Sequence, residues 1–334
     1  MTHAGQIVQI LTTGGTISSK LTGSGGYSPA VGAGELLHGL SVEHSVVRTE
    51  EFSRVLSYSL GYRHVAELVT RLSALESEPE VCGIVVTHGT GAMEEVAYLC
   101  DLTFSGTKPV VFTGATYHAS DPGSDGPHNL AAAIQVASDP QSQGRGVTIC
   151  FAGEIHTARD AIKLHKYSPV AFASPNGPLG LVDAGGVVYY RQATGRIHFP
   201  FPPLPAPQVE VVKAVFDMDD LLLRAAIEAG VAGIVLEGLP GSGGVPPALL
   251  PSVAQALDRQ IPVVLASRAP YGRITPISRG ESGPRVLYEM GAIMAGDLPA
   301  HKARLLVAVV TGDGQNVGQL RETFRLVARG GHVS

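Results

Sequence analysis

The chain lacks tryptophan, and aromatic residues make up only 6% of its 334 residues. Charged residues are also scarce, at 16%, whereas hydrophobic residues reach 44%. This composition excludes an intrinsically disordered chain, which combines high charge with low hydrophobicity. The apolar side chains suffice for a sizeable core, and the length predicts one large domain or two.

Clusters of basic residues are missing as well. The chain has 24 Lys and Arg against 29 Asp and Glu, a net charge of −5, and the basic residues form no run. Nucleic-acid binding depends on a concentration of Lys and Arg that neutralises phosphates. The composition therefore excludes nucleic acid as an expected partner.

Cysteine is rare and scattered, at Cys82, Cys100 and Cys150. An odd count with no CxxC spacing argues against a disulfide framework, and no histidine lies at metal-ligand spacing, so we expect no metal site. No apolar run is long enough to cross a membrane, and the first residues lack a basic region followed by an apolar one. These absences predict a cytoplasmic protein with no membrane partner.

Glycine, in contrast, is abundant, with 41 residues. The apolar stretch 7–11 predicts a buried strand that ends in Thr12-Thr13-Gly14-Gly15-Thr16. Ligands of open α/β sheets bind at such strand ends, where glycine permits a sharp turn and a close approach. A hydroxyl beside free backbone amides has the parts of a nucleophile with an oxyanion hole. The alternative is a plain connection in which the threonines only cap the turn.

The same arrangement recurs along the chain. Residues 81–86 predict a buried strand that ends in Thr87-His88-Gly89-Thr90-Gly91, and 109–112 predict another that ends in Thr113-Gly114. Amphipathic helices are expected between such strands, for example over 61–75. Strands that alternate with helices predict an α/β fold with a parallel sheet and right-handed crossovers. His88 is interpreted as structural, through a hydrogen bond to the backbone, and Asp125 as a helix cap.

A proline-rich segment divides the chain. Residues 199–208 read Phe-Pro-Phe-Pro-Pro-Leu-Pro-Ala-Pro-Gln, which bars a helix or a central strand. We therefore expect an N-terminal catalytic α/β domain over 1–198, a linker over 199–208 and a C-terminal α/β domain over 209–334. A hairpin is expected over 187–198, just before the linker.

Taken together, several motifs resemble those of bacterial L-asparaginases and glutaminase-asparaginases. They follow the family's order along nearly the whole chain. The matching segments are Thr13-Gly14-Gly15-Thr16-Ile17, His88-Gly89-Thr90, Met93-Glu94-Glu95, Phe112-Thr113-Gly114-Ala115, Asp125-Gly126-Pro127-His128-Asn129-Leu130, Glu154-Ile155-His156, Ala158-Arg159, Lys163, Gly177-Pro178-Leu179-Gly180 and Lys302-Ala303-Arg304-Leu305-Leu306.

The resemblance implies an N-terminal doubly wound, mainly parallel domain and a smaller C-terminal α/β domain. It also implies a homodimer or homotetramer that needs no cofactor and hydrolyses a small-molecule amide through an acyl-threonine. Position by position, it makes Thr13 the nucleophile, Tyr27 the lid tyrosine that helps to activate it, Thr90 the second catalytic threonine and Lys163 the lysine bonded to Thr90. A lysine with a lowered pKa can act as the base for a threonine hydroxyl.

The substrate-binding residues implied by the resemblance are Ser53 and Arg54 and the glycines of the turns, Gly14, Gly89 and Gly91. Backbone amides around Gly14 and Gly89 are candidates for the oxyanion hole.

Three departures from the family pattern concern the substrate. Gly91 stands where the family carries Asp, which meets the substrate's α-ammonium and orients the lysine. Arg54 stands where the family carries a neutral polar residue, and 280–285 do not clearly supply the family's acidic residue. An ammonium group would lose its partner and meet a cation instead. We therefore expect a substrate without the free α-amino group of asparagine, such as a carboxylate clamped by Arg54.

Alternatives stay open. The same nucleophile would serve a lactone or ester hydrolase or an acyl transferase, and the protein can be an L-asparaginase proper. A non-catalytic homologue that binds a small molecule would have no need of Thr13, Thr90 and Lys163 together. An amidase subunit of a tRNA amidotransferase shares these motifs, but usually carries an extra N-terminal domain.

Overall fold

The computed structural model describes residues 6–21, 26–29, 31–32, 34–37, 46–193 and 196–328. The chain divides into two compact units, Met1–Thr194 and Gly195–Ser334. The linker expected over 199–208 thus lies at the start of the second unit. Its extent as a linker stays a prediction.

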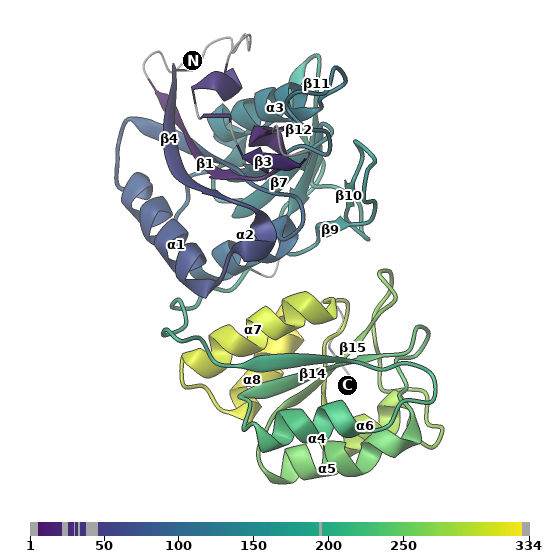
Figure 1. The fold of residues 1–334 in the computed structure, drawn as a ribbon. Helices are drawn as coiled ribbons and strands as arrows, with labels where there is room; N and C mark the ends of the chain where they lie inside the picture. The colour runs from purple at the N-terminus through teal and green to yellow at the C-terminus, as the bar shows by residue number, and fades with distance from the viewer. Residues whose placement is uncertain are drawn as a thin grey trace. The chain divides into compact units, whose positions relative to one another are not determined.

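An eight-stranded sheet organises the first unit (Figure 1). Its order is β12-β11-β8-β7-β6-β5-β1-β4, and the strands from β7 to β4 are parallel. The strands are β1 (Ile7–Gly14), β4 (Val46–Val55), β5 (Val81–Thr87), β6 (Val110–Thr113), β7 (Val147–Phe151), β8 (Glu154–Thr157), β11 (Gly180–Asp183) and β12 (Gly186–Tyr189).

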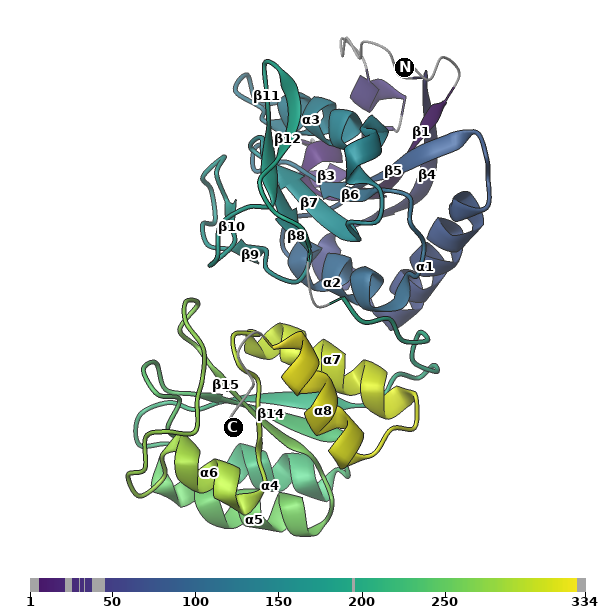
Figure 2. The ribbon, with the colours of Figure 1, turned by 180° about the vertical axis from the view of Figure 1, so that it is seen from behind.

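Helices cover both faces of this sheet. In Figures 1 and 2, α3 (Gly126–Ser138) lies on one side, and α1 (Tyr62–Glu76) and α2 (Met93–Thr103) lie on the other. The predicted doubly wound, mainly parallel domain is therefore confirmed. Single-turn 3-10 helices interrupt the loops that the structure describes in this unit, namely η1 (Thr16–Ser18), η2 (Glu35–Leu37), η3 (Ser57–Ser59) and η4 (Pro140–Ser142).

Close contact between α3 and β5 depends on one glycine. A β-carbon on Gly83 would lie 1.9 Å from the carbonyl oxygen of Ala137, at the end of α3. Around this contact, one face of the sheet and α3 bury a common apolar cluster that includes Val8, Ile10, Val85, Val111, Leu130 and Ile134. The glycine thus lets the helix backbone approach the central strands.

The end of the sheet beyond β7 is antiparallel, through the pairs β7–β8, β8–β11 and β11–β12. The hairpin expected over 187–198 is wrong: it is β11–β12, which turns at Asp183–Gly186. Val187 and Val188 pair backward with Val182 and Leu181, because the apolar run 179–182 lies before them. Two short antiparallel pairs complete the unit, β2 (Ser19–Leu21) with β3 (Tyr27–Pro29) and β9 (Ile162–Lys163) with β10 (Phe172–Ala173).

The second unit has a four-stranded parallel sheet in the order β13-β14-β15-β16, with helices on both faces (Figure 1). This confirms the smaller C-terminal α/β domain. Its elements are β13 (Val209–Lys213), α4 (Leu221–Glu228), β14 (Gly233–Gly238), η5 (Pro247–Leu249), α5 (Leu250–Asp258), β15 (Val263–Ser267), α6 (Pro284–Met290), β16 (Ile293–Met294), α7 (Ala300–Gly312) and α8 (Val317–Val327).

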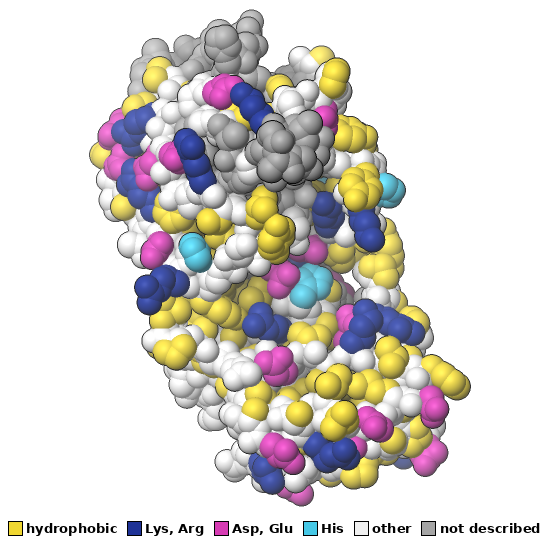
Figure 3. All heavy atoms as spheres, in the orientation of Figure 1, with side chains coloured by type: hydrophobic (Ala, Val, Ile, Leu, Met, Phe, Trp, Pro, Cys, Tyr) yellow, Lys and Arg dark blue, Asp and Glu magenta, His cyan; other side chains and the backbone are white. Residues whose placement is uncertain are grey.

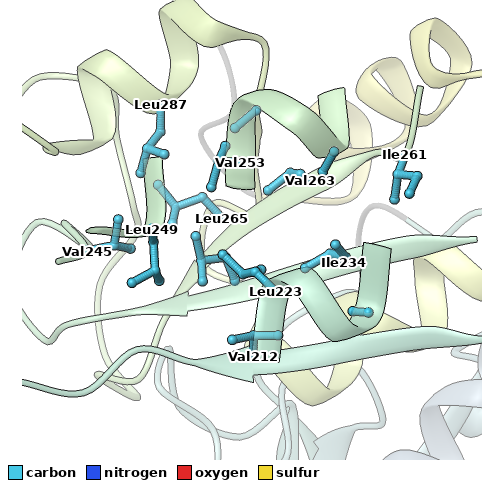
Figure 4. Close-up of a cluster of buried hydrophobic side chains, with 14 of the residues drawn as sticks. Val212, Leu223, Ile234, Val245, Leu249, Val253, Ile261, Val263, Leu265 and Leu287 are labelled. Atoms are coloured by element: carbon cyan, nitrogen blue, oxygen red, sulfur yellow. The ribbon is translucent and has the colours of Figure 1, made fainter. Parts of the chain in front are cut away.

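A separate apolar core holds this unit together. Figure 4 shows side chains of the sheet, such as Ile234 and Leu265, meeting those of the helices, such as Leu223 and Val253. These four side chains are almost fully buried. Each unit therefore has its own core, as an independently stabilised domain requires.

Among the described residues, no helix combines the length and the apolar character that a membrane crossing demands. On the face drawn in Figure 3, basic and acidic side chains lie interspersed over both units. Charges of opposite sign also pair elsewhere in the chain, for example Arg71 with Glu50 at 2.8 Å.

Candidate active site

The turn after β1 places Thr13 at the carboxyl end of a central strand, 3% exposed. Its hydroxyl donates a hydrogen bond to the carbonyl oxygen of Thr87 at the end of β5, at 2.9 Å. On the other side, the hydroxyl of Ser53 on β4 donates to the carbonyl oxygen of Thr13 at 3.1 Å. Three neighbouring strands therefore fix this threonine, and Ser53 lies beside it.

Two glycine turns touch through their backbones. Gly14 and Gly15 have φ of +104° and +84°, which side-chain-bearing residues rarely adopt. A β-carbon on Gly15 would lie 2.4 Å from the Cα of Gly89, and one on Gly14 would lie 2.5 Å from the carbonyl oxygen of Val55. Only glycine permits this approach, which brings the turn of Thr13 against the turn that carries Thr90.

Thr90 and Lys163 form a direct pair. The Lys163 Nζ donates to the Thr90 Oγ1 at 2.6 Å, although 73 residues separate them in the chain. Lys163 lies on β9, and its backbone amide donates to Glu94 Oε2 of α2 at 3.0 Å. Glu94 thus fixes the strand that presents the lysine to the threonine.

Burial lowers the pKa of Lys163 below its ordinary value, because a partly buried ammonium loses hydration. The negative charges of Glu94 and Asp125 oppose this effect by stabilising the ammonium. The net direction is toward a lysine that gives up its proton more readily. Such a lysine, bonded to a hydroxyl, can take up a proton from it.

The turn that carries Thr90 also has two backbone amides without a partner among the described residues. Within the described part of the chain, the backbone amides of Gly89 and Thr90 donate no hydrogen bond, although both residues are buried. Buried amides are almost always paired, so two free ones at a strand end suit a ligand oxygen. They supply the donors of a candidate oxyanion hole.

His88 has the structural role that its position predicts. Its Nδ1 lies 2.8 Å from the carbonyl oxygen of Gly89, to which a neutral ring can donate. Complete burial lowers the pKa of His88 to about 4, so the ring is neutral near pH 7. A neutral, buried ring fixes the turn without adding charge to the site.

Arg54 forms an ion pair with Glu51, with Nη2 and Oε2 2.6 Å apart. Its side chain is 52% exposed on the edge strand β4. Glu51 raises the pKa of this guanidinium by hydrogen bonding and by its charge. The structure thus gives Arg54 an acidic partner, and its role as a substrate clamp stays a prediction.

Tyr27 lies in β3, which pairs with β2 beyond the turn of Thr13. The side chain of Tyr27 lies outside what the structure describes, so its role as the lid tyrosine also stays a prediction. The other predicted residues, Gly14, Gly89 and Gly91, lie on the turns described above.

The expectation that Asp125 caps α3 with its side chain is wrong. The carboxylate makes no cap bond to the helix; it accepts from the amides of Thr116 and Tyr117, at 3.0 and 2.9 Å. These two amides lie in the loop after β6, outside the strand pairing of the sheet, and the Asp125 carboxylate accepts their hydrogen bonds. Asp125 therefore orders the loop after β6, and its carboxylate also accepts from the Asn129 side chain of α3 at 3.2 Å.

Ser57 is a functional residue candidate that no motif of the sequence singles out, because serines in loops are common. Its side chain is 7% exposed on η3 and lies against the second glycine turn. A β-carbon on Gly89 would lie 2.9 Å from the Ser57 Oγ, and one on Gly91 would lie 3.1 Å from it. No motif marks this serine, and only the fold brings it to the site.

The geometry suits acyl transfer to a hydroxyl. It offers two buried threonine hydroxyls on touching turns, a lysine of lowered pKa on one of them, and free amides beside it. These are the parts that a nucleophile, a base and an oxyanion hole require.

Comparison with known proteins gives consistent matches. The family model described as "Asparaginase, N-terminal" matches residues 7–195, and "Glutaminase/Asparaginase C-terminal domain" matches residues 208–324. An "L-asparaginase" of Bacillus licheniformis is 33% identical over 307 residues, which cover 91% of this chain and 94% of that protein. A "Probable L-asparaginase" of Deinococcus radiodurans is 36% identical over 329 residues, 95% of each chain.

A solved structure gives the same result for the fold. The crystal structure of a "Probable Cytoplasmic L-asparaginase" from Campylobacter jejuni superposes with a TM-score of 0.85 at 26% sequence identity. The match covers 96% of this chain and 99% of that one. The likeness therefore extends over both units and not over one domain alone.

Proposed function

Since this chain belongs to the asparaginase family, we propose that it hydrolyses the amide bond of a small molecule through an acyl-enzyme on Thr13. The observation that carries the proposal is the 2.6 Å bond from Lys163 to Thr90, on a turn whose backbone touches the turn of Thr13. A lysine of lowered pKa at that place supports proton transfer from a hydroxyl nucleophile.

The reaction has two balanced halves. The Thr13 Oγ forms a bond to the amide carbon while its proton passes to the base formed by Lys163 and Thr90. The carbon–nitrogen bond then breaks, and the leaving nitrogen takes that proton and departs as ammonia or an amine. Water attacks the threonine ester next, which releases a carboxylic acid and restores the hydroxyl.

The amides of Gly89 and Thr90 would hold the oxyanion in both halves. Because these amides donate no hydrogen bond to any described residue, they can bind a substrate oxygen without first breaking another bond. The hydroxyl of Thr13 must leave the carbonyl oxygen of Thr87 before it transfers its proton, because it donates its hydrogen bond to that oxygen.

We further propose that the substrate lacks the free α-amino group of asparagine. Gly91 offers no carboxylate to an ammonium group, and Arg54 adds a cation on the neighbouring strand. The Glu51 partner offsets part of that positive charge. A substrate carboxylate that displaced Glu51 would form a comparable charge-assisted bond with Arg54.

L-asparaginase activity proper is the second candidate. The names of the Bacillus licheniformis and Deinococcus radiodurans relatives favour it, since both proteins are similar over more than nine tenths of this chain. It requires that an acidic group other than residue 91 meets the ammonium group. Steady-state kinetics on asparagine, glutamine and succinamic acid, the asparagine skeleton without its amino group, separate the two candidates.

Intact-mass spectrometry tests the nucleophile. The wild type and Thr13→Ala are mixed with amides, esters and lactones under acid quench, with Thr12→Ala as a matched control on the preceding residue. We expect an acyl adduct on the wild type and on Thr12→Ala and none on Thr13→Ala. An adduct that persists in Thr13→Ala would refute Thr13 as the nucleophile.

The choice of donor that gives turnover distinguishes the remaining alternatives. Turnover of esters or lactones with none of amides would favour an esterase, lactonase or acyl transferase. No adduct and no turnover with any donor would favour a non-catalytic binding protein and refute the proposed hydrolysis.

A further inference from the structure

The backbone conformation at residue 91 does not require a glycine. Its φ lies outside the left-handed region, so a residue with a side chain would meet no backbone strain there. Its chain neighbours aside, the Ser57 Oγ is the one atom among the described residues within 4 Å of where its β-carbon would lie. Among the described residues, the space beside Gly91 thus meets one hydroxyl, and Gly91 itself is exposed.

The Ser57 hydroxyl has hydrogen-bonding capacity to spare. Its side chain is 7% exposed, yet its Oγ forms no hydrogen bond with any residue that the structure describes. A serine hydroxyl can donate one bond and accept two. Packed against Gly89 and Gly91, it flanks Thr90, whose own hydroxyl accepts from Lys163.

From these contacts we infer that Ser57 and Gly91 together form a specificity subsite. It accepts an uncharged, hydrogen-bonding substituent, such as a hydroxyl, at the substrate position where asparagine carries its α-amino group. Gly91 supplies the room, and Ser57 supplies the bond. The inference rests on the proposed function, because it takes Thr90 and Lys163 as part of the reacting site.

Charge explains why the substituent is uncharged. The three residues of η3, Ser57, Tyr58 and Ser59, carry no carboxylate, and Gly91 carries no side chain. The charged group next to them in sequence is Arg54, which repels an ammonium and is indifferent to a neutral hydroxyl. A hydroxyl also satisfies the free Ser57 Oγ, which would otherwise lose water without gaining a partner.

The test compares 2-hydroxysuccinamic acid with succinamic acid, which lacks the hydroxyl. We expect the wild type to prefer the hydroxylated amide in kcat/KM, and Ser57→Ala to reduce that preference about 3- to 10-fold, the worth of one neutral hydrogen bond. Ser59→Ala, an exposed serine on the same turn, is the matched control and should keep the wild-type preference. An equal preference in the wild type and Ser57→Ala would overturn the inference.

Binding supplies a readout that does not depend on turnover. Isothermal titration calorimetry on Thr13→Ala, with and without Ser57→Ala, should show the same 3- to 10-fold change in the ratio of the two dissociation constants. The proposed function fails if no donor in the panel is turned over, whereas the inference fails if Ser57→Ala leaves this ratio unchanged or if neither amide binds.

A second pair of variants tests whether the two positions act together. Because a β-carbon at 91 would lie 3.1 Å from the Ser57 Oγ, Gly91→Asp alone is crowded by the hydroxyl. We expect Gly91→Asp with Ser57→Gly to raise the preference for asparagine over succinamic acid at least about tenfold, and Gly91→Asp alone to raise it less. Equal gains in the single and the double variant would show that Ser57 does not share the subsite.

Discussion

One proton on Lys163 decides whether the site can act as a base. The Nζ bonded to Thr90 accepts a proton only in its neutral form, and burial favours that form. Glu94 and Asp125 act in the opposite sense, since their charges stabilise the ammonium. Under the proposed function, we expect the balance of these charges to set the pH range of activity.

We expect kcat/KM to rise with pH as Lys163 loses its proton, in a range below the pKa of an exposed lysine. Glu94→Gln removes a charge that holds the lysine pKa up, so the rising limb should move to lower pH. Glu95→Gln, the neighbour on α2 whose charge is not among those that shift Lys163, is the control. A limb that stays in place or moves upward in Glu94→Gln would contradict this assignment.

His88 predicts a pH dependence of stability. Its pKa is about 4 in the folded protein and near 6.5 in the unfolded chain, so the unfolded chain binds more protons between these values. Stability should therefore fall as pH decreases from about 6.5 to about 4, by on the order of 2–3 kcal/mol for this group.

Chemical unfolding at several pH values measures this loss. His88→Gln should flatten the slope of the unfolding free energy across that window, whereas His165→Gln, an exposed histidine, should not. His301 contributes in the same direction, since burial also lowers its pKa to about 4, so the slope should not vanish. An unchanged slope in His88→Gln would show that the ring is not buried neutral.

At the scale of the elements, the contact of β5 with α3 leaves no room for a side chain at residue 83. Gly83→Ala would place a β-carbon 1.9 Å from the Ala137 carbonyl oxygen, and neither backbone can yield without moving a strand or a helix. We expect a loss of more than about 3 kcal/mol in the free energy of unfolding, or failure to fold.

The matched control is Gly61→Ala at the start of α1. Gly61 has φ of −131°, and a β-carbon there would meet nothing within 4 Å among the described residues. Its stability should stay within about 1 kcal/mol of the wild type. Similar losses in the two variants would mean that glycine flexibility, and not the helix contact, accounts for the effect.

Elements with local signals were predictable from the sequence. The apolar runs of β5 and β6 and the helical spacing of α1 predict them, and the structure places them within a few residues. The β11–β12 hairpin was missed for a local reason, since residues 187–189 pair with the segment before them and not with the one after them. The pairing of β8 with β11 was not predictable, because it joins segments distant in sequence. Asp125 shows the same limit, since its partners are amides of a preceding loop.

The site divides in the same way. Thr13, Thr90 and Lys163 stand on motifs, and the structure brings Lys163 to Thr90 as the resemblance implies. Ser57 belongs to no motif. Its place beside Gly91 follows from how η3 packs on the turn after β5, which the sequence does not show. Arg54 shows a charge in the sequence, but its pairing with Glu51 appears only in the folded edge strand.

At the scale of the whole molecule, two units with separate cores make up the chain. The family resemblance predicts that such chains associate as a homodimer or homotetramer. Size-exclusion chromatography with light scattering should give two or four times the chain mass of 34.7 kDa. The chain's low net charge predicts the same mass at low and high salt. A monomer at micromolar concentration would contradict the prediction.

The contact between Gly15 and Gly89 has a consequence for how such a site can change over time. Main chain sets the spacing of the two threonine turns, so no side chain has to be kept for that purpose. Arg54, Ser57 and Gly91 are not part of this Gly15–Gly89 contact, although the Ser57 Oγ restricts which side chain fits at residue 91. Under the proposed function, selectivity among amides can therefore change while the two turns keep their spacing.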